Sequence, residues 1–316
     1  MYIIIAAGLN EKMKKRLCQT FVDVEFAFYN SLQDVGDDLT KAEVLVTYGQ
    51  NLTEERLRKA ENLQWLMVLS AGLDHLPLKA IKERGILLTN VRGIHKIPIS
   101  EFVFAFILQY VKKFPLFLKE KERKHWNRQV QIDELYGKTL LVVGAGAIGS
   151  HIAKLAKGFG MKTLGIKRSV SKNEHFDAIY PMEKLDEVLP LADFVVSVLP
   201  STEATKNVFT KEQFSLMKTN SVFINVGRGD AVNERDLLAA LNQGEIAHAY
   251  LDVFQEEPLP ENHPFWSCKN ITITPHITGV TAPYLERAME IFETNLHHYL
   301  NEKEHMINIV DLDRGY

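Results

Sequence analysis

Cysteine is scarce in this chain, which has two among its 316 residues. Cys18 and Cys268 lie far apart and form neither a CxxC nor a CxxH spacing, which excludes a disulfide framework and a structural zinc site. A reducing cytoplasm is the expected location, and no metal is expected. An excess of basic residues is missing too. Because the formal net charge is −3, neither a nucleic acid nor a membrane surface is an expected partner.

Long apolar runs are also missing. The most apolar predicted helix, EFVFAFILQYVKKF, has about ten apolar residues, whereas a bilayer requires roughly 20. The segment MYIIIAAGLNEKMKK has no basic stretch before its short apolar run, which predicts a first β-strand rather than a signal peptide. The composition, 46% apolar and 24% charged, is ordinary for a soluble globular protein, and the length suggests two domains.

Two series of short apolar runs alternate with amphipathic segments. The first comprises YIIIAA, VEFAF, EVLVTY, QWLMVLS and ILLTN, and the second comprises TLLVVGAG, KTLGIK, ADFVVSVLP, SVFINVG, AHAYLDV and ITITPHI. The alternation predicts parallel β-α-β units, and the most apolar runs predict sheets with helices on both faces. The polar segment FPLFLKEKERKHWNRQVQIDELYGK lies between the series. We interpret it as a hinge, with Pro115 as a kink point near the end of a long helix.

A glycine-rich turn follows the first strand of the second series, in TLLVVGAGAIGSHIAKLAKGFG. Gly144, Gly146 and Gly149 form a GxGxxG pattern between an apolar strand and a helix. In this pattern the first glycine permits a tight turn, the second lets the backbone approach a pyrophosphate, and the third lets the helix pack on the strand. Ala147 and Ile148, in the first turn of the helix, would present N–H groups to phosphates. The pattern predicts a dinucleotide site, and the alternative is a turn without a ligand.

Three polar side chains lie in three loops, each directly after a predicted strand of the second series. NVGRGDAVNE contains Arg228, DVFQEEPLP contains Glu257 and TPHITG contains His276. The carboxyl ends of strands line the ligand crevice of a doubly wound sheet, so these loops are expected to meet at one site. Taken singly, each residue has an ordinary interpretation, namely a solvated arginine, a surface glutamate and a structural histidine.

Taken together, the three residue types fit the reduction of a 2-keto acid. Arg228 would pair with the substrate carboxylate and polarise the carbonyl oxygen. His276 would give a proton to that oxygen as a hydride arrives, and Glu257 would hold the other ring nitrogen and keep the imidazole charged. These three residues are the predicted catalytic group.

Over nearly its whole length the chain resembles the D-isomer-specific 2-hydroxyacid dehydrogenases, a family that includes glyoxylate/hydroxypyruvate reductases, D-lactate dehydrogenases and D-3-phosphoglycerate dehydrogenases. The most specific segments occur in the order of the family: GKTLLVVGAGAIGS, LADFVVSVLPSTEAT, SVFINVGRGDAVNERDLLAAL, AYLDVFQEEPLP and ITITPHITG. The resemblance gives Arg228, Glu257 and His276 the roles reached above from chemistry. It implies an NAD(P)-dependent enzyme that acts on the CH–OH group of a D-2-hydroxy acid, and a homodimer.

The resemblance also implies an α/β fold of two doubly wound domains with a cleft between them. A Rossmann cofactor domain, residues 98–283, would be inserted into a flavodoxin-like substrate domain. The substrate domain would consist of residues 1–97 and a C-terminal helix within residues 284–316. Closure of the domains on a ligand would exclude water from the hydride path.

Further site residues follow from the same resemblance. In WLMVLSAGLDHL, the backbone N–H groups of Ala71, Gly72 and Leu73 would hold the substrate carboxylate opposite Arg228. The residues implied near the nucleotide are Leu199, Pro200, Thr205, His276, Val226 behind the nicotinamide and Asp252 near its carboxamide. In NVRGIHKIPISE, the candidates near the pocket are Arg92, His95 and Ile97.

An acidic residue is missing at the end of the second strand of the predicted cofactor domain. NAD-specific relatives have a carboxylate near position 167, which binds the ribose hydroxyls and would repel a 2′-phosphate. LGIKRSV instead contains Lys167, Arg168 and Ser169, two cations and a hydroxyl suited to a dianion. NADP is therefore the predicted preferred cofactor, with NAD as the alternative. The other interpretation is a solvated basic loop that tolerates either.

The same fold also carries nucleotide-sensing regulators and corepressors, which provide the alternative function. A sensor would not need Arg228, Glu257 and His276 together, and the regulators would be expected to have extra tails for their partners. An enzyme is therefore favoured.

The substrate is left open among glyoxylate, hydroxypyruvate, pyruvate and bulkier 2-keto acids, because the directions of Trp266, Tyr284 and His95 would set the size of the pocket. Phosphohydroxypyruvate is disfavoured because no additional basic cluster adjoins SAGLDH. Formate is disfavoured because the related formate dehydrogenases have an amide in place of Glu257.

Overall fold

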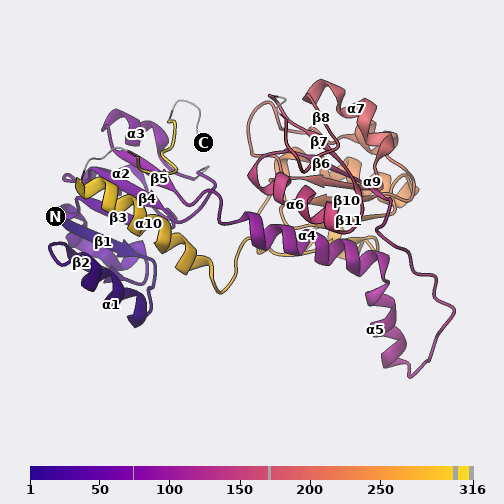
Figure 1. Cartoon of the computed structure of the whole chain (residues 1–316), viewed down its shortest axis with the longest axis horizontal. Helices are drawn as coiled ribbons and strands as arrows, with labels where there is room; N and C mark the ends of the chain where they lie inside the picture. Colours follow the sequence, from indigo (N-terminus) through magenta and orange to yellow (C-terminus); the bar gives the residue numbers. More distant parts are fainter. Residues whose placement is uncertain (74, 170–171, 302–304, 313–316) are drawn as a thin grey trace. The chain divides into compact units, whose positions relative to one another are not determined.

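The computed structural model describes residues 1–73, 75–169, 172–301 and 305–312. The chain divides into two compact units, each built around one sheet (Figure 1). Unit 1 comprises Met1–Ile94 and Thr281–Tyr316, and unit 2 comprises His95–Val280. Unit 2 is therefore an insertion in the sequence of unit 1. None of the described helices is both long and apolar enough to span a bilayer.

Unit 1 has a five-stranded parallel sheet in the order β2-β1-β3-β4-β5, which is the flavodoxin-like order. Its strands are β1 (Tyr2–Ala6), β2 (Glu25–Tyr29), β3 (Val44–Thr47), β4 (Trp65–Val68) and β5 (Leu87–Asn90). Its helices are α1 (Glu11–Thr20), the 3-10 helix η1 (Leu32–Lys41), α2 (Glu54–Lys59), α3 (Leu78–Glu83) and α10 (Tyr284–Asn301). The C-terminal helix expected within residues 284–316 is present as α10.

Both faces of this sheet are buried, because neighbouring residues along each strand point to opposite faces and both sets are apolar. Ile3 and Ile5 of β1 lie in a cluster with residues of α1 and α10, which cover one face. Ile4, between them, packs in a second cluster with residues of η1, α2 and α3 on the other face. The apolar runs of the sequence therefore formed a sheet covered on both sides.

Unit 2 has a seven-stranded parallel sheet in the order β12-β11-β10-β9-β6-β7-β8. Its strands are β6 (Thr139–Val143), β7 (Lys162–Ile166), β8 (Ala178–Tyr180), β9 (Phe194–Ser197), β10 (Val222–Asn225), β11 (His248–Leu251) and β12 (Ile271–Ile273). Its helices are α4 (Lys96–Val111), α5 (Phe114–Glu122), α6 (Ala147–Gly158), α7 (Leu185–Val188), α8 (Lys211–Leu216) and α9 (Glu234–Gln243). Short 3-10 helices lie at Met182–Lys184, Leu189–Leu191, Gly229–Ala231 and Pro264–Ser267.

The strand order of unit 2 reverses at β6, which has β7 on one side and β9 on the other. Chain connections leave β6 and β9 toward opposite sides of the sheet at such a point, and ligands bind outside the carboxyl ends of the strands there. Residues of α4 and α6 pack on one face and residues of α7, α8 and α9 on the other. The predicted fold of two doubly wound parallel-sheet domains is confirmed.

Two details differ from the predictions. The strand β8 was not predicted, because its three residues, AIY, form a shorter run than the others. The predicted kink at Pro115 is wrong, since α4 ends at Val111 and the chain turns at Lys113, which has a left-handed φ of 58°. Pro115 lies in the first turn of α5, where its missing N–H costs no hydrogen bond. The predicted hinge is wrong as well, because residues 114–138 lie inside unit 2.

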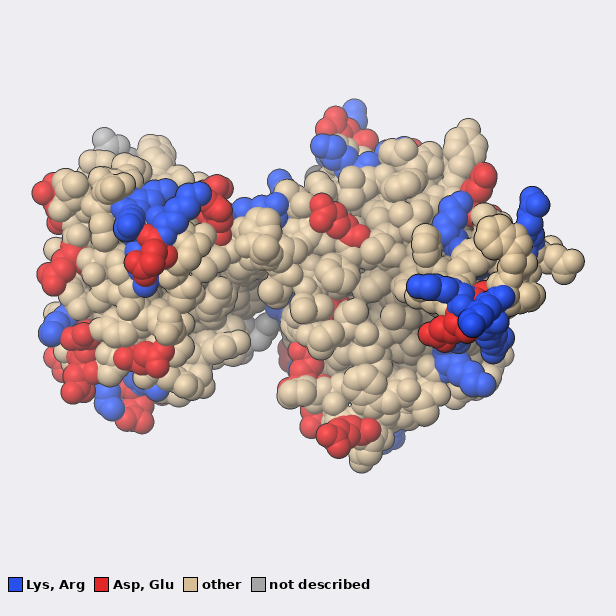
Figure 2. Space-filling view, turned by 90° about the horizontal axis from the view of Figure 1, so that it is seen from below, with Lys and Arg blue, Asp and Glu red and all other residues tan. Residues whose placement is uncertain are grey.

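Charged side chains of both signs are interspersed on the face of each unit that Figure 2 shows. Some form pairs along one helix, such as Lys14 with Glu11 at 2.8 Å and Lys59 with Glu55 at 3.2 Å. Exposed pairs of this kind each contribute little to the free energy of unfolding. Acidic and basic residues therefore alternate even along single helices, such as α1 and α2.

Candidate active site

The three predicted catalytic residues follow three adjacent parallel strands of unit 2. Arg228 follows β10, Glu257 follows β11 and His276 follows β12. These strands are hydrogen-bonded neighbours in the order β12-β11-β10. Their carboxyl ends therefore bring the three loops to one edge of the sheet, as the positions in the sequence predicted.

His276 and Glu257 form a direct pair, with 2.7 Å between Nδ1 of the imidazole and Oε2 of the carboxylate. The other carboxylate oxygen, Oε1, accepts a hydrogen bond of 2.9 Å from the backbone N–H of Phe254. The side chains of His276 and Glu257 are 50% and 33% exposed, so the pair lies at the surface of unit 2. Since Nδ1 faces the carboxylate, Nε2 is the ring nitrogen that can exchange a proton with a ligand.

The loop that carries His276 is held by the buried carboxylate of Asp252. Its Oδ1 accepts from the Thr274 hydroxyl at 2.6 Å and from the Ile277 N–H at 3.0 Å. Its Oδ2 accepts from the Thr278 hydroxyl at 2.6 Å and from the Thr278 N–H at 3.1 Å. The backbone N–H of His276 also donates to the Asp252 carbonyl at 2.8 Å. Asp252 therefore touches the loop on both sides of the imidazole.

His276 has a left-handed φ of 49°, which is uncommon for a residue with a Cβ. Such a conformation costs of the order of 1–3 kcal/mol, and the surrounding hydrogen bonds have to offset it. The bonds from residues 274, 277 and 278 to Asp252 serve this purpose here.

Arg228 lies in a tightly packed turn. Its Nη1 donates to the Gly227 carbonyl at 2.9 Å, and its own carbonyl accepts from Nδ2 of Asn225 at 3.0 Å. The next residue, Gly229, packs directly on the loop of Glu257, because a Cβ there would lie 1.9 Å from the carbonyl carbon of Phe254. The loops of Arg228 and Glu257 are therefore in backbone contact, which leaves no room for a side chain between them.

His95, a candidate from the resemblance, lies close enough to Arg228 for their charges to interact. Burial, and to a smaller extent the positive charge of Arg228, lower the pKa of His95 to about 4. The imidazole of His95 is therefore neutral at physiological pH. Arg92 is exposed and Ile97 half-buried, and they flank His95 at the point where the chain passes from unit 1 to unit 2.

The glycine-rich turn has the geometry that a phosphate site needs. Gly144 has a φ of +108°, and a Cβ there would lie 2.8 Å from the Val198 carbonyl. A Cβ on Gly149 would lie 2.4 Å from the Gly144 carbonyl, so α6 packs directly on the turn. Gly146 is exposed, caps the N-terminus of α6 and has open space where a Cβ would be. The turn therefore fits the pyrophosphate of a dinucleotide, with Ala147 and Ile148 in the first turn of the helix.

The remaining cofactor candidates divide into exposed and buried residues. Lys167, Arg168 and Ser169 follow β7, and the last two are exposed. Leu199 and Val226 are buried and Pro200 is exposed, after β9 and β10. The hydroxyl of Thr205 donates to the Pro200 carbonyl at 2.6 Å and accepts from the Thr202 N–H at 2.9 Å. Its hydroxyl thus shapes the loop after β9, and both carboxylate oxygens of Asp252 are likewise used within the protein.

The predicted substrate loop lies in unit 1, after β4. The hydroxyl of Ser70 donates to the Gly72 carbonyl at 2.8 Å, and Nδ2 of Asn90 donates to the Ala71 carbonyl at 3.4 Å. Leu73 is buried while Ala71 is exposed. The carbonyl groups of the turn are thus occupied from the protein side. Within the described part of the chain, no cluster of His, Cys, Asp or Glu side chains is arranged to hold a metal.

Two threonines of the loop that carries His276 were not predicted to have a role. Thr274 and Thr278 stand two residues on either side of His276 and both give their hydroxyl groups to Asp252. The pattern TPHIT was a usable signal, because hydroxyl groups that flank a histidine symmetrically are suited to fixing its loop.

Known proteins are similar to this chain over most of its length. A model for the NAD binding domain of D-isomer specific 2-hydroxyacid dehydrogenases matches residues 104–278. The chain is 35% identical over 289 residues to glyoxylate/hydroxypyruvate reductase B of Shigella dysenteriae, and the match covers 88% of each protein. It is 32% identical over 280 residues to D-3-phosphoglycerate dehydrogenase of Methanocaldococcus jannaschii. That match covers 87% of this chain but only 52% of the longer relative.

A solved structure shows the same architecture. It is an NADPH-dependent glyoxylate/hydroxypyruvate reductase from Sinorhizobium meliloti in complex with NADP and sulfate. The TM-score is 0.84 at 25% identity, and the match covers 100% of this chain and 99% of that one. These similarities place the chain among the nicotinamide-dependent oxidoreductases. It belongs to the D-isomer specific 2-hydroxyacid dehydrogenase family, which confirms the resemblance seen in its motifs.

The substitution Asp252→Asn should destabilise unit 2 by on the order of 2–4 kcal/mol, because an amide can accept only part of the four hydrogen bonds and brings a donor against buried donors. Urea unfolding followed by circular dichroism would measure this loss. Asp23→Asn, an exposed change of the same kind, is the control and should leave the midpoint unchanged. An unfolding midpoint of Asp252→Asn equal to that of the wild type would contradict the role given to Asp252.

Proposed function

We propose that this protein reduces a small 2-keto acid to the D-2-hydroxy acid with a nicotinamide cofactor, and runs the reverse reaction through the same groups. The observation that carries the proposal is the 2.7 Å contact between His276 and Glu257 at the sheet edge that also bears Arg228. The relatives named glyoxylate/hydroxypyruvate reductase support a small, unphosphorylated keto acid as the substrate.

The three side chains divide the chemistry among them. Arg228 binds the substrate carboxylate and polarises the carbonyl oxygen through its guanidinium. His276 gives the proton on Nε2 to that oxygen, while Glu257 accepts the hydrogen bond from Nδ1 and stabilises the charged imidazole. In the reverse direction, Nε2 takes the proton from the hydroxyl group. Since His95 is neutral, Arg228 is the cation that we propose for the substrate carboxylate.

The glycine-rich turn would hold the cofactor in unit 2, which we propose as the cofactor domain. Gly144, Gly146 and the first turn of α6 would contact the pyrophosphate, and Leu199, Pro200, Thr205 and Val226 would line the nucleotide. When bound, a nicotinamide cofactor supplies the hydride. In unit 1, the N–H groups of residues 71–73 would cradle the substrate carboxylate.

NADP is the cofactor that we propose this chain prefers. Lys167 and Arg168 follow β7, where NAD-specific proteins of this fold have an acidic residue. A guanidinium can pair with a 2′-phosphate and stack on the adenine ring. The S. meliloti reductase with NADP bound supports this preference.

We also propose that two copies of the chain associate through α5. This helix extends from the body of unit 2 (Figure 1), and its apolar side chains are exposed, with Phe114 at 56%, Phe117 at 39% and Leu118 at 59%. An apolar helix face of this kind is stabilised when a second copy covers it. The cysteines Cys18 and Cys268 are free thiols, which suits the proposed reducing cytoplasm.

His276→Ala should lower kcat for keto-acid reduction by on the order of 10²- to 10⁴-fold, because the proton donor is lost while the cofactor site is intact. Loss of NADPH absorbance with glyoxylate or hydroxypyruvate measures the rate, and NADPH fluorescence measures cofactor binding. Arg228→Ala should act similarly, and Glu257→Gln should lose less. The exposed neighbour Glu256, changed to Gln, is the control. A His276→Ala enzyme with the wild-type kcat would refute the assignment.

Arg168→Ala should weaken NADPH binding on the order of 10- to 100-fold and NADH binding hardly at all, because one charge-assisted hydrogen bond to the 2′-phosphate is removed. Titration calorimetry with each cofactor gives the two dissociation constants. Lys162→Ala removes the same charge at the opposite end of β7 and should affect neither. Equal weakening of both cofactors by Arg168→Ala would mean that the loop does not read the phosphate.

The wild-type protein should sediment at twice the 36.0 kDa of one chain. Phe114→Glu combined with Leu118→Glu should shift it to the single-chain mass, since two carboxylates would be buried in the interface. Val22→Glu, at an apolar position of unit 1 that is 78% exposed, is the matched control and should keep the double mass. A wild-type protein that sediments as a single chain at micromolar concentration would rule out this association.

A further inference from the structure

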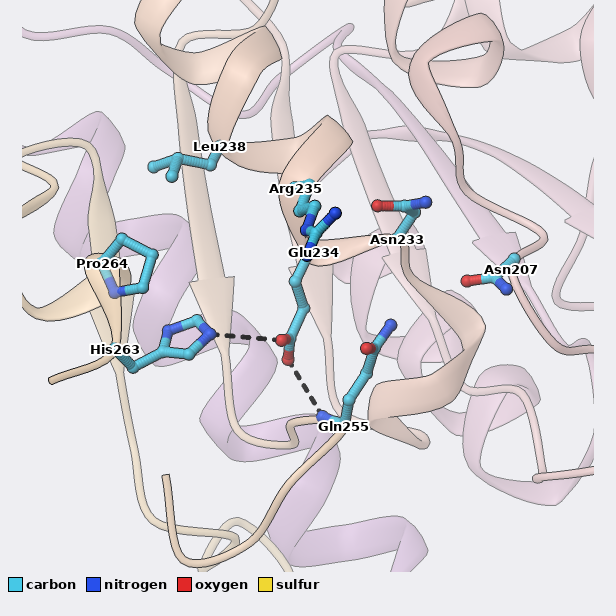
Figure 3. A pocket seen from close by; sticks show the side chains of 8 residues that line it. All are labelled: Asn207, Asn233, Glu234, Arg235, Leu238, Gln255, His263 and Pro264. Carbon is cyan, nitrogen blue, oxygen red and sulfur yellow. Dashed lines mark hydrogen bonds and ion pairs between the residues drawn. The ribbon is translucent and has the colours of Figure 1, made fainter. Parts of the chain in front are cut away.

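A second histidine and glutamate pair contacts the loop that carries Glu257, at the backbone of Gln255. Glu234 is the first residue of α9, and its Oε2 lies 3.3 Å from Nε2 of His263. Their side chains are only 16% and 19% exposed. Figure 3 shows the pair in the wall of a pocket of about 490 Å³, with Gln255 beside it. None of the reaction steps described above uses this pair.

Glu234 contacts the catalytic loop through its second oxygen. Oε1 accepts a hydrogen bond of 2.9 Å from the backbone N–H of Gln255, drawn as a dashed line in Figure 3. The side chain of Gln255 returns to the same segment, since its Nε2 donates to the Val232 carbonyl at 2.7 Å. Two hydrogen bonds thus hold Gln255, one to Glu234 at the start of α9 and one to the Val232 carbonyl just before that helix.

The anchored residue, Gln255, directly follows Phe254, whose backbone N–H holds the carboxylate of Glu257. The N–H of Phe254, which donates to Oε1 of Glu257, belongs to the residue before Gln255. On its other side, the same residue packs against the backbone of Gly229. The Phe254 backbone is therefore fixed between Gly229 and the anchored Gln255. Its N–H in turn fixes the carboxylate that faces His276.

Glu234 is itself rigidly placed. Asn233 caps α9, its side chain accepting from the Asp236 N–H at 3.2 Å, and Leu237 and Leu241 bury the helix in the core. A carboxylate at the first helical position is also favoured by the helix dipole. With His263 on one oxygen and the Gln255 N–H on the other, its rotamer is set from two directions. The start of α9 is thus a fixed point to which the Gln255 N–H is bonded.

We propose that Glu234, held by His263, is a positioning residue of the reaction that acts through Gln255 and Phe254 on the carboxylate of Glu257. This proposal rests on the proposed function, because it requires that Glu257 supports proton transfer by His276. Small displacements of a catalytic group cost large factors in rate, whereas cofactor binding at the glycine-rich turn does not depend on this loop. Glu234 therefore affects kcat and leaves cofactor affinity unchanged.

The test is a set of single and double variants assayed with glyoxylate or hydroxypyruvate and NADPH. Glu234→Ala should lower kcat on the order of 10-fold, with the dissociation constant of NADPH unchanged. Glu234→Gln keeps an oxygen for the Gln255 N–H and should retain most of the activity. Arg235→Ala, the next residue on the same helix turn and exposed in the same pocket, is the control and should match the wild type.

The double variant distinguishes positioning from a general structural effect. In the Glu257→Gln background, Glu234→Ala should lower kcat by no more than about 2-fold, because the group on which it acts is already impaired. A full 10-fold additional loss, an unchanged kcat in Glu234→Ala, or an equal loss in Arg235→Ala would each overturn the proposal.

A substitute variant and two control outcomes separate the positioning role from the proposed function. If thermal melting shows that Glu234→Ala does not fold, Gln255→Ala takes its place, since it removes only the bond to Val232. It should lower kcat a few-fold, and it should add no such loss in the Glu257→Gln background. A wild-type kcat of Gln255→Ala would overturn the proposal.

If His276→Ala and Glu257→Gln keep full activity, the proposed function fails and the positioning role fails with it. If they lose activity while Glu234→Ala and Gln255→Ala do not, only the positioning role fails.

Discussion

The buried carboxylate of Asp252 is the interaction on which the candidate site depends. A charge that is 1% exposed needs several hydrogen bonds to be tolerated, and this one receives four, all from the loop after β12. Because these four hydrogen bonds all come from the loop after β12, they also fix the conformation of that loop. Because the loop has no regular secondary structure at His276, satisfying Asp252 is what gives it a single conformation.

The loops after β10, β11 and β12 hold one another along this edge of the sheet. Gly229 of the first loop lies against the Phe254 backbone of the second, and Asp252 of the second holds the third. The loop of each proposed catalytic side chain is thereby supported by a neighbouring loop as well as by its own strand. Such mutual support is how an active site can be organised before a ligand arrives, which reduces the reorganisation needed during the reaction.

Much of this could be predicted from sequence, for identifiable reasons. Apolar runs predict strands because both faces of these sheets are buried, and GxGxxG marks a turn in which Gly144 and Gly149 leave no room for a Cβ. The chemistry of Arg228, Glu257 and His276 pointed to one site because loops after parallel strands share an edge. The break of the helix at Lys113 could not be predicted, because a left-handed lysine is set by its tertiary surroundings. Nor could the contact of Glu234 with Gln255, which joins residues 21 positions apart through one side-chain oxygen.

The insertion of unit 2 into unit 1 has a consequence for the order in which the protein can fold during synthesis. Residues 95–280 are contiguous, so unit 2 can complete its core as soon as they have left the ribosome. Unit 1 cannot, because α10 supplies Ala288, Met289, Phe292 and Leu296 to the face that β1 and β4 expose. Until that last helix emerges, α1 alone covers that face, and Trp65 has no contact with Phe292 and Tyr299. The segment that is made first thus completes its fold last, and for most of translation the part of its apolar face that α10 will cover is the surface that a chaperone would have to protect.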